Sequence, residues 1–221
     1  MVEIRGATVY GGVVSDPSVF SDQPTISEPL SASRIRAAAM KCFATHGTEA
    51  TSLRMVALTA DVSIGLVQHH FGSKAALIKA VDDELVTIVS EAAPLPVPPP
   101  DPIADVGHRV TSLIAEHPDA IDYLAHLLIE DHPTGRVIFD KLLDIGKAQW
   151  DSRRAQGHLR PDLDPTWSTL NPLILVLGTL ILRSHIERQL AQPFTTAAQL
   201  RKWETAINSL IDGGQLQKPY Q

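Results

Sequence analysis

The chain has 221 residues, of which 44% are hydrophobic, 20% are charged and only 5% are aromatic. This composition favours helices, because strands select aromatic and β-branched residues. The formal net charge of −6, taken over the whole chain, argues against a nucleic acid partner. The most apolar stretch, residues 170–182, includes a proline and a glycine and is shorter than the roughly 18 residues that a membrane span needs.

The single cysteine, Cys42, excludes an intramolecular disulfide and fits a reducing compartment. It follows a lysine in a helical pattern, so we expect a small buried thiol; a redox sensor is the alternative, although no second cysteine could resolve it within the chain. The N-terminus lacks the basic start and apolar run of a signal peptide. We therefore expect a cytoplasmic protein with no membrane segment.

Residues 1–30 are rich in glycine, serine, proline and aspartate, carry a charge of −3 and show no sustained periodicity. Because the charge is negative, these residues are not expected to form a basic arm that enters the minor groove of DNA. These residues are expected to form a flexible N-terminal extension.

Residues 31–80 differ sharply from the rest of the chain in charge. They contain six lysines and arginines against two acids, a local charge of +4, which leaves −10 for the remainder. Phosphate binding needs only a local basic face, so the overall acidity does not exclude DNA. The first helix predicted here follows an apolar stripe and ends near Gly47: Ile35, Ala38, Ala39, Cys42 and Phe43.

Two short helices should follow. Ser52 is placed to cap one, and Ser63 to cap the next, which ends before residues 72–73. Asp61 falls in the turn between them, where aspartate is one of the few residues other than glycine that tolerates a left-handed backbone. Two such helices suit the width of a major groove. A long helix is expected from Lys74 to about residue 91.

The segment 94–102 contains six prolines and cannot be helical, because consecutive prolines remove amide donors and fix the backbone angles. It is predicted to be a stiff linker; a proline-rich recognition ligand is the alternative.

Helical patterns return beyond the linker. We expect helices near residues 103–114, 121–128, 139–150, 165–190 and 195–212, the last closed by two glycines at 213–214. Pro172 either kinks the fourth of these or marks its true start. No strand or internal repeat is indicated, so the fold class is all-α.

The run TSLRMVALTADVSIGLVQHHFGSK at residues 51–74 resembles the signature of the TetR family of transcriptional regulators, and the helix before it has Ile35, Ala38, Phe43 and Gly47 in the family's places. The resemblance covers residues 31–80; the rest is similar only in size and helix number. It implies a helix-turn-helix DNA-binding domain at 31–80, followed by a larger helical ligand-binding and dimerisation domain at 81–221.

The resemblance also implies the DNA contacts. The recognition helix would place Ile64, Gly65, Leu66 and Gln68 nearest the groove floor, and Gln68, where relatives often have tyrosine, could bind an adenine edge. Phosphates or base edges would be met by a second set of residues: Ser52, Arg54, Ser63, His69, His70 and Lys74. The two serines can be plain caps as well. A metal site at the adjacent histidines is disfavoured, because neighbouring side chains on a helix point about 100° apart.

For the C-terminal half, the resemblance implies a homodimer through the last two helices, at about residues 165–190 and 195–212. A two-fold dimer would place its recognition helices about 34–36 Å apart on a pseudo-palindromic operator; a buried helix in a monomer is the alternative. The effector is expected to be a hydrophobic or amphipathic small molecule bound near Tyr123, His126, Phe139, Trp150 and Trp167.

The predicted function is ligand-responsive control of transcription, as a repressor that leaves its operator when the effector binds, with no cofactor and no enzymatic activity. One alternative is a helical ligand-binding dimer without a DNA role. The other, a metal-dependent or hydrolytic enzyme, lacks a motif such as HExxH or Gly-x-Ser-x-Gly. The remaining histidines are scattered: His108, His117, His126, His132, His158 and His185.

Overall fold

The computed structural model describes residues 28–92 and 102–216, which fold into ten helices. Their only strand-like feature is an isolated bridge between Leu159 and Leu216, so the all-α prediction is confirmed. Most of the expected N-terminal extension and of the proline-rich linker lies outside the described residues. No helix in the described ranges is long and apolar enough to cross a membrane.

The first four helices follow the predicted order: α1 (Glu28–Ala50), α2 (Leu53–Thr59), α3 (Ile64–Phe71) and α4 (Lys74–Ala92). Helix α1 begins at Glu28, three residues before the expected start. Its expected end shows as a break at Gly47, whose φ of 76° and ψ of 165° leave the helical region. Glycine adopts this backbone without the penalty that a Cβ would impose.

Six helices form the C-terminal half: α5 (Pro102–Glu116), α6 (Pro118–Ile129), α7 (Pro133–Ala155), α8 (Pro165–Ile181), α9 (Arg183–Glu187) and α10 (Ala197–Gln215). The single helix expected over 165–190 is therefore two, divided at Leu182. Helix α8 starts at Pro165, because the Asp164 carboxylate accepts hydrogen bonds from the Thr166 and Trp167 amides. Pro172 lies within the helix.

The predicted end of α10 at residues 213–214 is wrong, since the helix continues to Gln215. A glycine in a helix costs only about 1 kcal/mol relative to alanine, and tertiary contacts hold this end in place. Ile211 and Gln215 are buried, and the Arg160 amide donates a 3.0 Å hydrogen bond to the Gln215 carbonyl.

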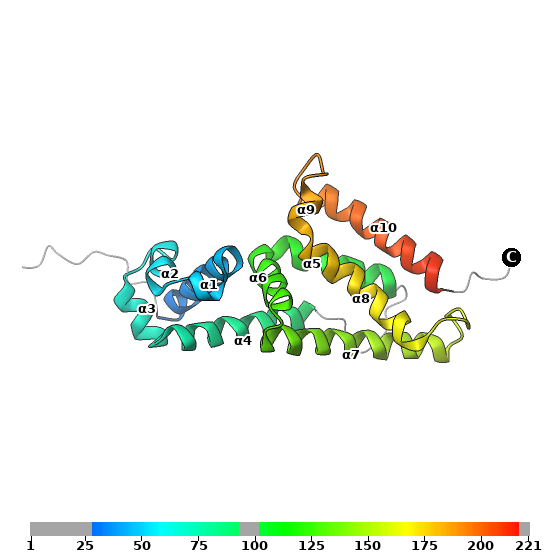
Figure 1. Ribbon diagram of the computed structural model, residues 1–221, viewed down its shortest axis with the longest axis horizontal. Coiled ribbons are helices and arrows are strands. Elements are labelled where there is room, and N and C mark those ends of the chain that lie inside the picture. The colour runs from blue at the N-terminus through cyan, green and yellow to red at the C-terminus, as the bar shows by residue number, and fades with distance from the viewer. Residues whose placement is uncertain (1–27, 93–101, 217–221) are drawn as a thin grey trace, which may run out of the picture.

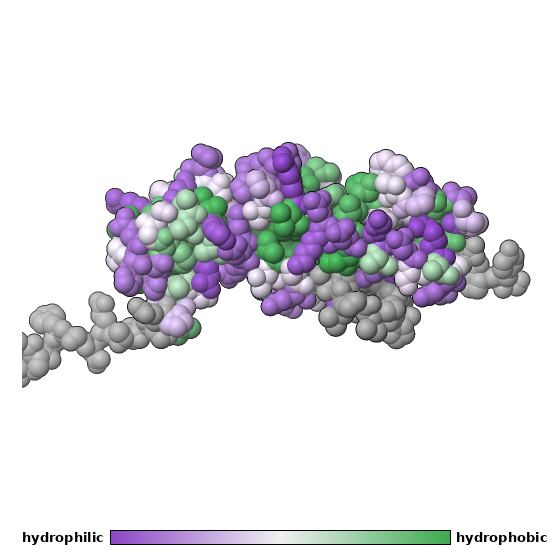
Figure 2. Space-filling view, turned by 90° about the horizontal axis from the view of Figure 1, so that it is seen from below, coloured by the Kyte–Doolittle hydropathy of each residue, from purple (hydrophilic) through white to green (hydrophobic). Residues whose placement is uncertain are grey.

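The helices form an elongated molecule with α1 to α3 at one end and α8 and α10 towards the other (Figure 1). Helices α4 and α7 run along one edge, and α6 lies between the two ends, packed against α1. One hydrophobic core joins α1 to α4 with α6; its largest fully buried side chains include Phe43, Leu77 and Tyr123. Figure 2 shows the molecule from below, on the side of α4 and α7. The most apolar residues of this face gather near its middle. A second core, around Ile114, Phe194 and Leu200, lies in the C-terminal half.

Candidate nucleic-acid interface

Side-chain caps and a left-handed residue shape the α2–turn–α3 unit. The Ser52 hydroxyl accepts the Met55 amide at 3.2 Å, and the Ser63 hydroxyl accepts the Leu66 amide at 3.1 Å. Asp61 has a φ of 53°, as its place in the turn predicted. The Val62 amide then donates to the Ala57 carbonyl at 3.0 Å. The two short helices are thus fixed relative to each other by local bonds.

Helix α3 presents one face to the core and the other to solvent. Val67 is fully buried and anchors the helix against α1 and α4. On the opposite side Ile64 is 46% exposed, and Gly65, Gln68 and His69 are also exposed. This outer face matches four of the residues for which DNA contacts were predicted.

Two of the residues predicted to meet DNA are half-buried and have contacts within the domain. Leu66 is half-buried and packs against the core, so its side chain is not at the outer face. His70 is half-buried as well, and its Nε2 lies 3.0 Å from the Ser31 hydroxyl of α1. Both follow from the helical period, because residues 66, 67 and 70 share the side of α3 that carries Val67. The DNA contacts of these two residues stay a prediction, beside the packing contacts described for them.

Lys74 and Arg54 lie at helix starts beside the recognition helix. The Lys74 ammonium donates a 2.9 Å hydrogen bond to the Glu49 carbonyl near the end of α1. This bond holds the half-buried Lys74 side chain beside the break between α3 and α4. Arg54 is exposed in the first turn of α2.

Other cations of the basic segment serve the domain itself. The Arg34 guanidinium donates to the Ala60 carbonyl at 2.7 Å, tying α1 to the end of α2. Arg36 pairs with Glu84 of α4, and Lys79 pairs with Asp83 one turn along the same helix. The local charge of +4 therefore overstates the charge available to a ligand.

A buried carboxylate connects α4 to the C-terminal half. Asp82 is 9% exposed and accepts hydrogen bonds from the hydroxyls of Tyr123 in α6, at 2.6 Å, and Thr134 in α7, at 2.7 Å. Burial, followed by the hydrogen bond to Asp82, raises the pKa of Tyr123 well above its ordinary value of 10. The Tyr123 ring packs against Phe43 of α1, with centroids 5.6 Å apart. Burial of Asp82 could not be predicted from the sequence, since an acid on a helix is ordinarily exposed.

A cavity of about 170 Å³ lies between α4, α5, α6, α7, α8 and α10. Its wall is mostly apolar and includes Leu113, Leu142, Leu173 and Trp203. Val89 and Ala92 at the end of α4 also line it, so one helix reaches from this cavity to the α2–α3 unit.

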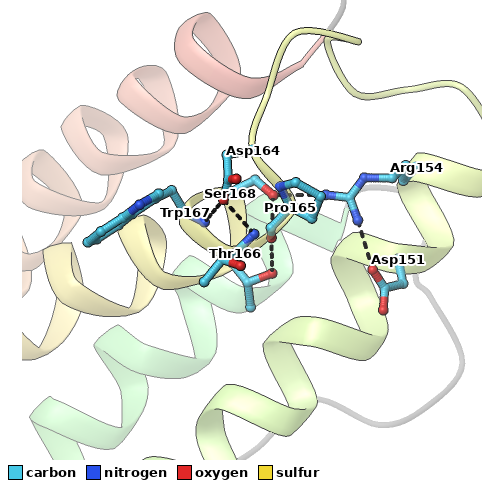
Figure 3. A network of polar contacts seen from close by, with 8 residues as sticks. Asp151, Arg154, Asp164, Pro165, Thr166, Trp167 and Ser168 are labelled. Atoms are coloured by element: carbon cyan, nitrogen blue, oxygen red, sulfur yellow. Dashed lines mark hydrogen bonds and ion pairs between the residues drawn. The ribbon is translucent and has the colours of Figure 1, made fainter.

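Of the five residues expected at a ligand pocket, only Trp150 lines this cavity. Tyr123 is in the other core, bonded to Asp82, and His126 and Phe139 are not in the wall. Trp167 is 56% exposed, and in Figure 3 its indole extends away from the polar contacts that join Asp164, Arg154 and their neighbours. The expected residues were chosen by aromatic type, whereas the wall of this cavity is mainly aliphatic, and their role in ligand binding stays a prediction.

The wall residues that α7 contributes lie on one face of the helix. The helix lines the cavity at steps of three and one residues, which make one helical face: Leu142, Ile145, Gly146, Gln149, Trp150 and Arg153. Within the described ranges no three His, Cys, Asp or Glu side chains are grouped so as to hold a metal ion.

Residues 35–81 match the family model of bacterial regulatory proteins of the tetR family. The HTH-type transcriptional regulatory protein RaaS of Mycobacterium tuberculosis is 30% identical over 132 residues, which are 60% of this chain and 61% of that protein. The HTH-type transcriptional repressor Rv3405c of the same organism is 32% identical over 134 residues, 58% of this chain and 65% of that one. The chain thus spans less than two thirds of these curated relatives.

Solved structures share the fold over most of their length. SmeT, the repressor of a multidrug efflux pump of Stenotrophomonas maltophilia, superposes with a TM-score of 0.63 at 19% identity, covering 85% of this chain and 91% of that one. A TetR family regulator of Chloroflexus aurantiacus gives 0.66 at 16% identity, with coverages of 88% and 96%. The matched proteins are regulators and not enzymes. Residues 35–81 are thus a helix-turn-helix domain of the tetR family of bacterial regulatory proteins, and the rest of the chain shares the fold of these solved regulators.

Proposed function

We propose that this protein binds a pseudo-palindromic DNA operator as a homodimer and represses transcription until a small apolar or amphipathic ligand binds. The observation that carries the DNA-binding role is the outer face of α3, where Ile64, Gly65, Gln68 and His69 are exposed together on a helix held by the buried Val67.

The contacts divide into two kinds. Ile64, Gly65, Gln68 and His69 would meet base edges, and Gln68 can make a bidentate pair with adenine. Phosphates would be bound by groups at the helix starts, which orient the domain without reading sequence: Ser52, Arg54, Ser63 and Lys74. Since α2 and α3 are fixed to each other by their caps and turn, both kinds of contact can form without rearrangement.

A stripe on α8 supports the homodimer. Its outward residues Trp167, Ile174, Leu175 and Leu182 are 37–56% exposed and recur at helical steps. A Cβ added at Gly178, on the same stripe, would meet nothing within 4 Å, so another helix could approach closely there. Leu210 on α10 adds a further exposed apolar side chain. Contiguous apolar surface of this kind marks an interface, and a two-fold pairing would use the same patch of both copies.

The cavity supports ligand control. Its apolar wall includes the end of α4, the helix that begins directly after the α3 break with Lys74. A ligand that fits one orientation of α4 better than another would shift the population of DNA-binding geometries. The solved SmeT–triclosan complex, TM-score 0.61, supports this role, because a protein of this fold binds a small molecule in that complex.

The DNA-binding role is tested by fluorescence anisotropy of the purified protein with DNA flanking its own gene, across a salt series. We expect nanomolar affinity for one pseudo-palindrome with two subunits bound. Lys74→Ala should weaken binding to every sequence and reduce the salt slope by about 1.8, because a dimer loses two phosphate contacts. Lys79→Ala, which removes the same charge from an exposed pair with Asp83, should leave both nearly unchanged.

Equal effects of the two lysine variants would contradict the proposed phosphate contact. A dimer that binds no DNA even at low salt would favour the alternative function, a ligand-binding protein without a DNA role.

A further inference from the structure

The start of α1 makes two polar contacts with the α2–turn–α3 unit. Arg34 is half-buried, and its guanidinium donates a 2.7 Å hydrogen bond to the Ala60 carbonyl. Ser31 is 3% exposed, and its hydroxyl lies 3.0 Å from Nε2 of His70. Residues three apart on a helix share a face, so both contacts leave α1 on the same side. Figure 1 shows α1, α2 and α3 together at one end of the molecule.

Each contact reaches the C-terminal end of a short helix. Ala60 is the C-cap of α2, and the last carbonyls of a helix have no partner within it. A cation there faces the negative end of the helix dipole, and a hydrogen bond from a charged donor is stronger than one between neutral groups. His70 lies in the last turn of α3. Helix α1 therefore holds both short helices at their far ends.

Apolar packing alone would leave the orientation of the two helices less well defined. Val56 of α2 and Val67 of α3 are fully buried in the core that they share with α1. Burial of apolar surface is favourable but has no preferred direction, whereas a hydrogen bond weakens steeply as its angle departs from linear. The two polar contacts thus oppose rotation of the α2–turn–α3 unit against α1.

This orientation bears on sequence recognition more than on general attraction to DNA. A bidentate pair between Gln68 and adenine needs the side chain within about 0.5 Å of its productive geometry. Attraction to phosphates is electrostatic and independent of sequence, so it tolerates a small rotation of α3. A unit that is already oriented before binding also loses less free energy in becoming ordered on DNA.

We infer that Arg34 is a positioning residue for sequence recognition. Its bond to the Ala60 carbonyl, supported by the contact of Ser31 with His70, holds α3 at the angle at which its outer face meets base edges. Arg34 acts through α2 and α3 and not as a reader of bases. This inference rests on the proposed function, because it takes α3 as the helix that binds the operator.

Fluorescence anisotropy of the full chain tests the inference with two duplexes of equal length. One is a duplex that wild type selects from random DNA, and the other has the same bases in shuffled order. The measured quantity is the ratio of the two dissociation constants. Arg34→Met should lower this preference roughly tenfold or more, the factor expected for one hydrogen bond from a charged group. Binding to the shuffled duplex should change little, and Arg34→Lys, which can still donate to the Ala60 carbonyl, should recover most of the preference.

Two matched controls separate position from charge and stability. Arg36 is also half-buried on α1, but it pairs with Glu84 of α4. Arg36→Met removes the same charge from the same helix and should keep the preference. Ser31→Ala should lower the preference by a smaller factor than Arg34→Met, whereas Ser33→Ala, at an exposed position, should not. Equal losses in the two arginine variants would overturn the inference.

The remaining outcomes also decide. A preference that Arg34→Met retains, or that Arg34→Lys fails to recover, would overturn the inference and leave the DNA-binding role intact. If thermal unfolding shows that Arg34→Met does not fold, Arg34→Gln and Arg36→Gln replace the methionine pair, and equal preferences in these two variants would again overturn it. A wild type that selects no sequence would overturn the proposed function itself, and this inference with it.

Discussion

The two ends of the molecule use their buried side chains differently. In the N-terminal domain the buried residues of α1 to α4 pack into one continuous core, and serine, lysine and arginine side chains fix the helix ends. In the C-terminal half, helices surround a cavity of about 170 Å³. A domain that binds DNA bases needs a fixed shape, and a close-packed interior resists deformation. A domain that binds a ligand needs internal space and helices that can move.

Phe43→Ala should have the largest effect on stability. The side chain is 1% exposed and packs against Tyr123, so its loss should cost about 3–5 kcal/mol of unfolding free energy. Leu173→Ala, at the cavity wall, should cost clearly less, because Leu173 is half-buried and borders empty space. Urea unfolding of both variants measures the difference; equal losses would remove the contrast between the two ends.

Gly135→Ala tests the tight approach of α6 and α7. A Cβ there would lie 2.7 Å from the Leu127 carbonyl oxygen, a backbone clash that should cost about 1–3 kcal/mol. Gly146→Ala, on the cavity wall, would meet its nearest atom, in Thr169, at 3.7 Å and should leave the melting temperature nearly unchanged. A normal melting temperature for Gly135→Ala would show that the two helices can separate at little cost.

Tyr123→Phe tests the link between the ends. Removing the hydroxyl takes one donor from buried Asp82 while Thr134 remains, so we expect a loss of about 1 kcal/mol. Because the folded pKa of Tyr123 is raised above its ordinary 10, folding favours the protonated phenol. This stabilisation is complete below pH 10 and is lost as the pH rises above it.

Unfolding free energies of wild type and Tyr123→Phe, measured from pH 8 to 11, should therefore converge at the alkaline end. A constant difference across that range would mean that ionisation of Tyr123 does not contribute.

Ser63→Ala should have a similarly small effect on stability, about 1 kcal/mol, because it removes the cap that accepts the Leu66 amide. Thermal unfolding checks this value. An unchanged melting temperature, with operator binding weakened, would assign the hydroxyl to DNA alone.

Local signals explain how much of this could be predicted from sequence. The caps at Ser52 and Ser63 and the left-handed Asp61 depend on neighbouring residues only, and each lies where it was expected. The partial burial of Leu66 and His70 was not expected, although the helical period set by Val67 implies it. The cavity could not be located in the same way, because six helices from distant parts of the chain form its wall. Aromatic type alone selected Tyr123 and Trp167, one in the other core and one at the surface.

The most direct test of the central claim, that α3 reads an operator, is selection of bound sequences from random DNA by wild type and by Gln68→Ala. We predict that wild type enriches a pseudo-palindrome whose half-sites reflect the two-fold pairing of recognition helices. Gln68→Ala should enrich a motif changed at one symmetric position, where adenine is no longer preferred, with little loss of overall affinity. No enriched motif for wild type, or the same motif for both proteins, would contradict this account.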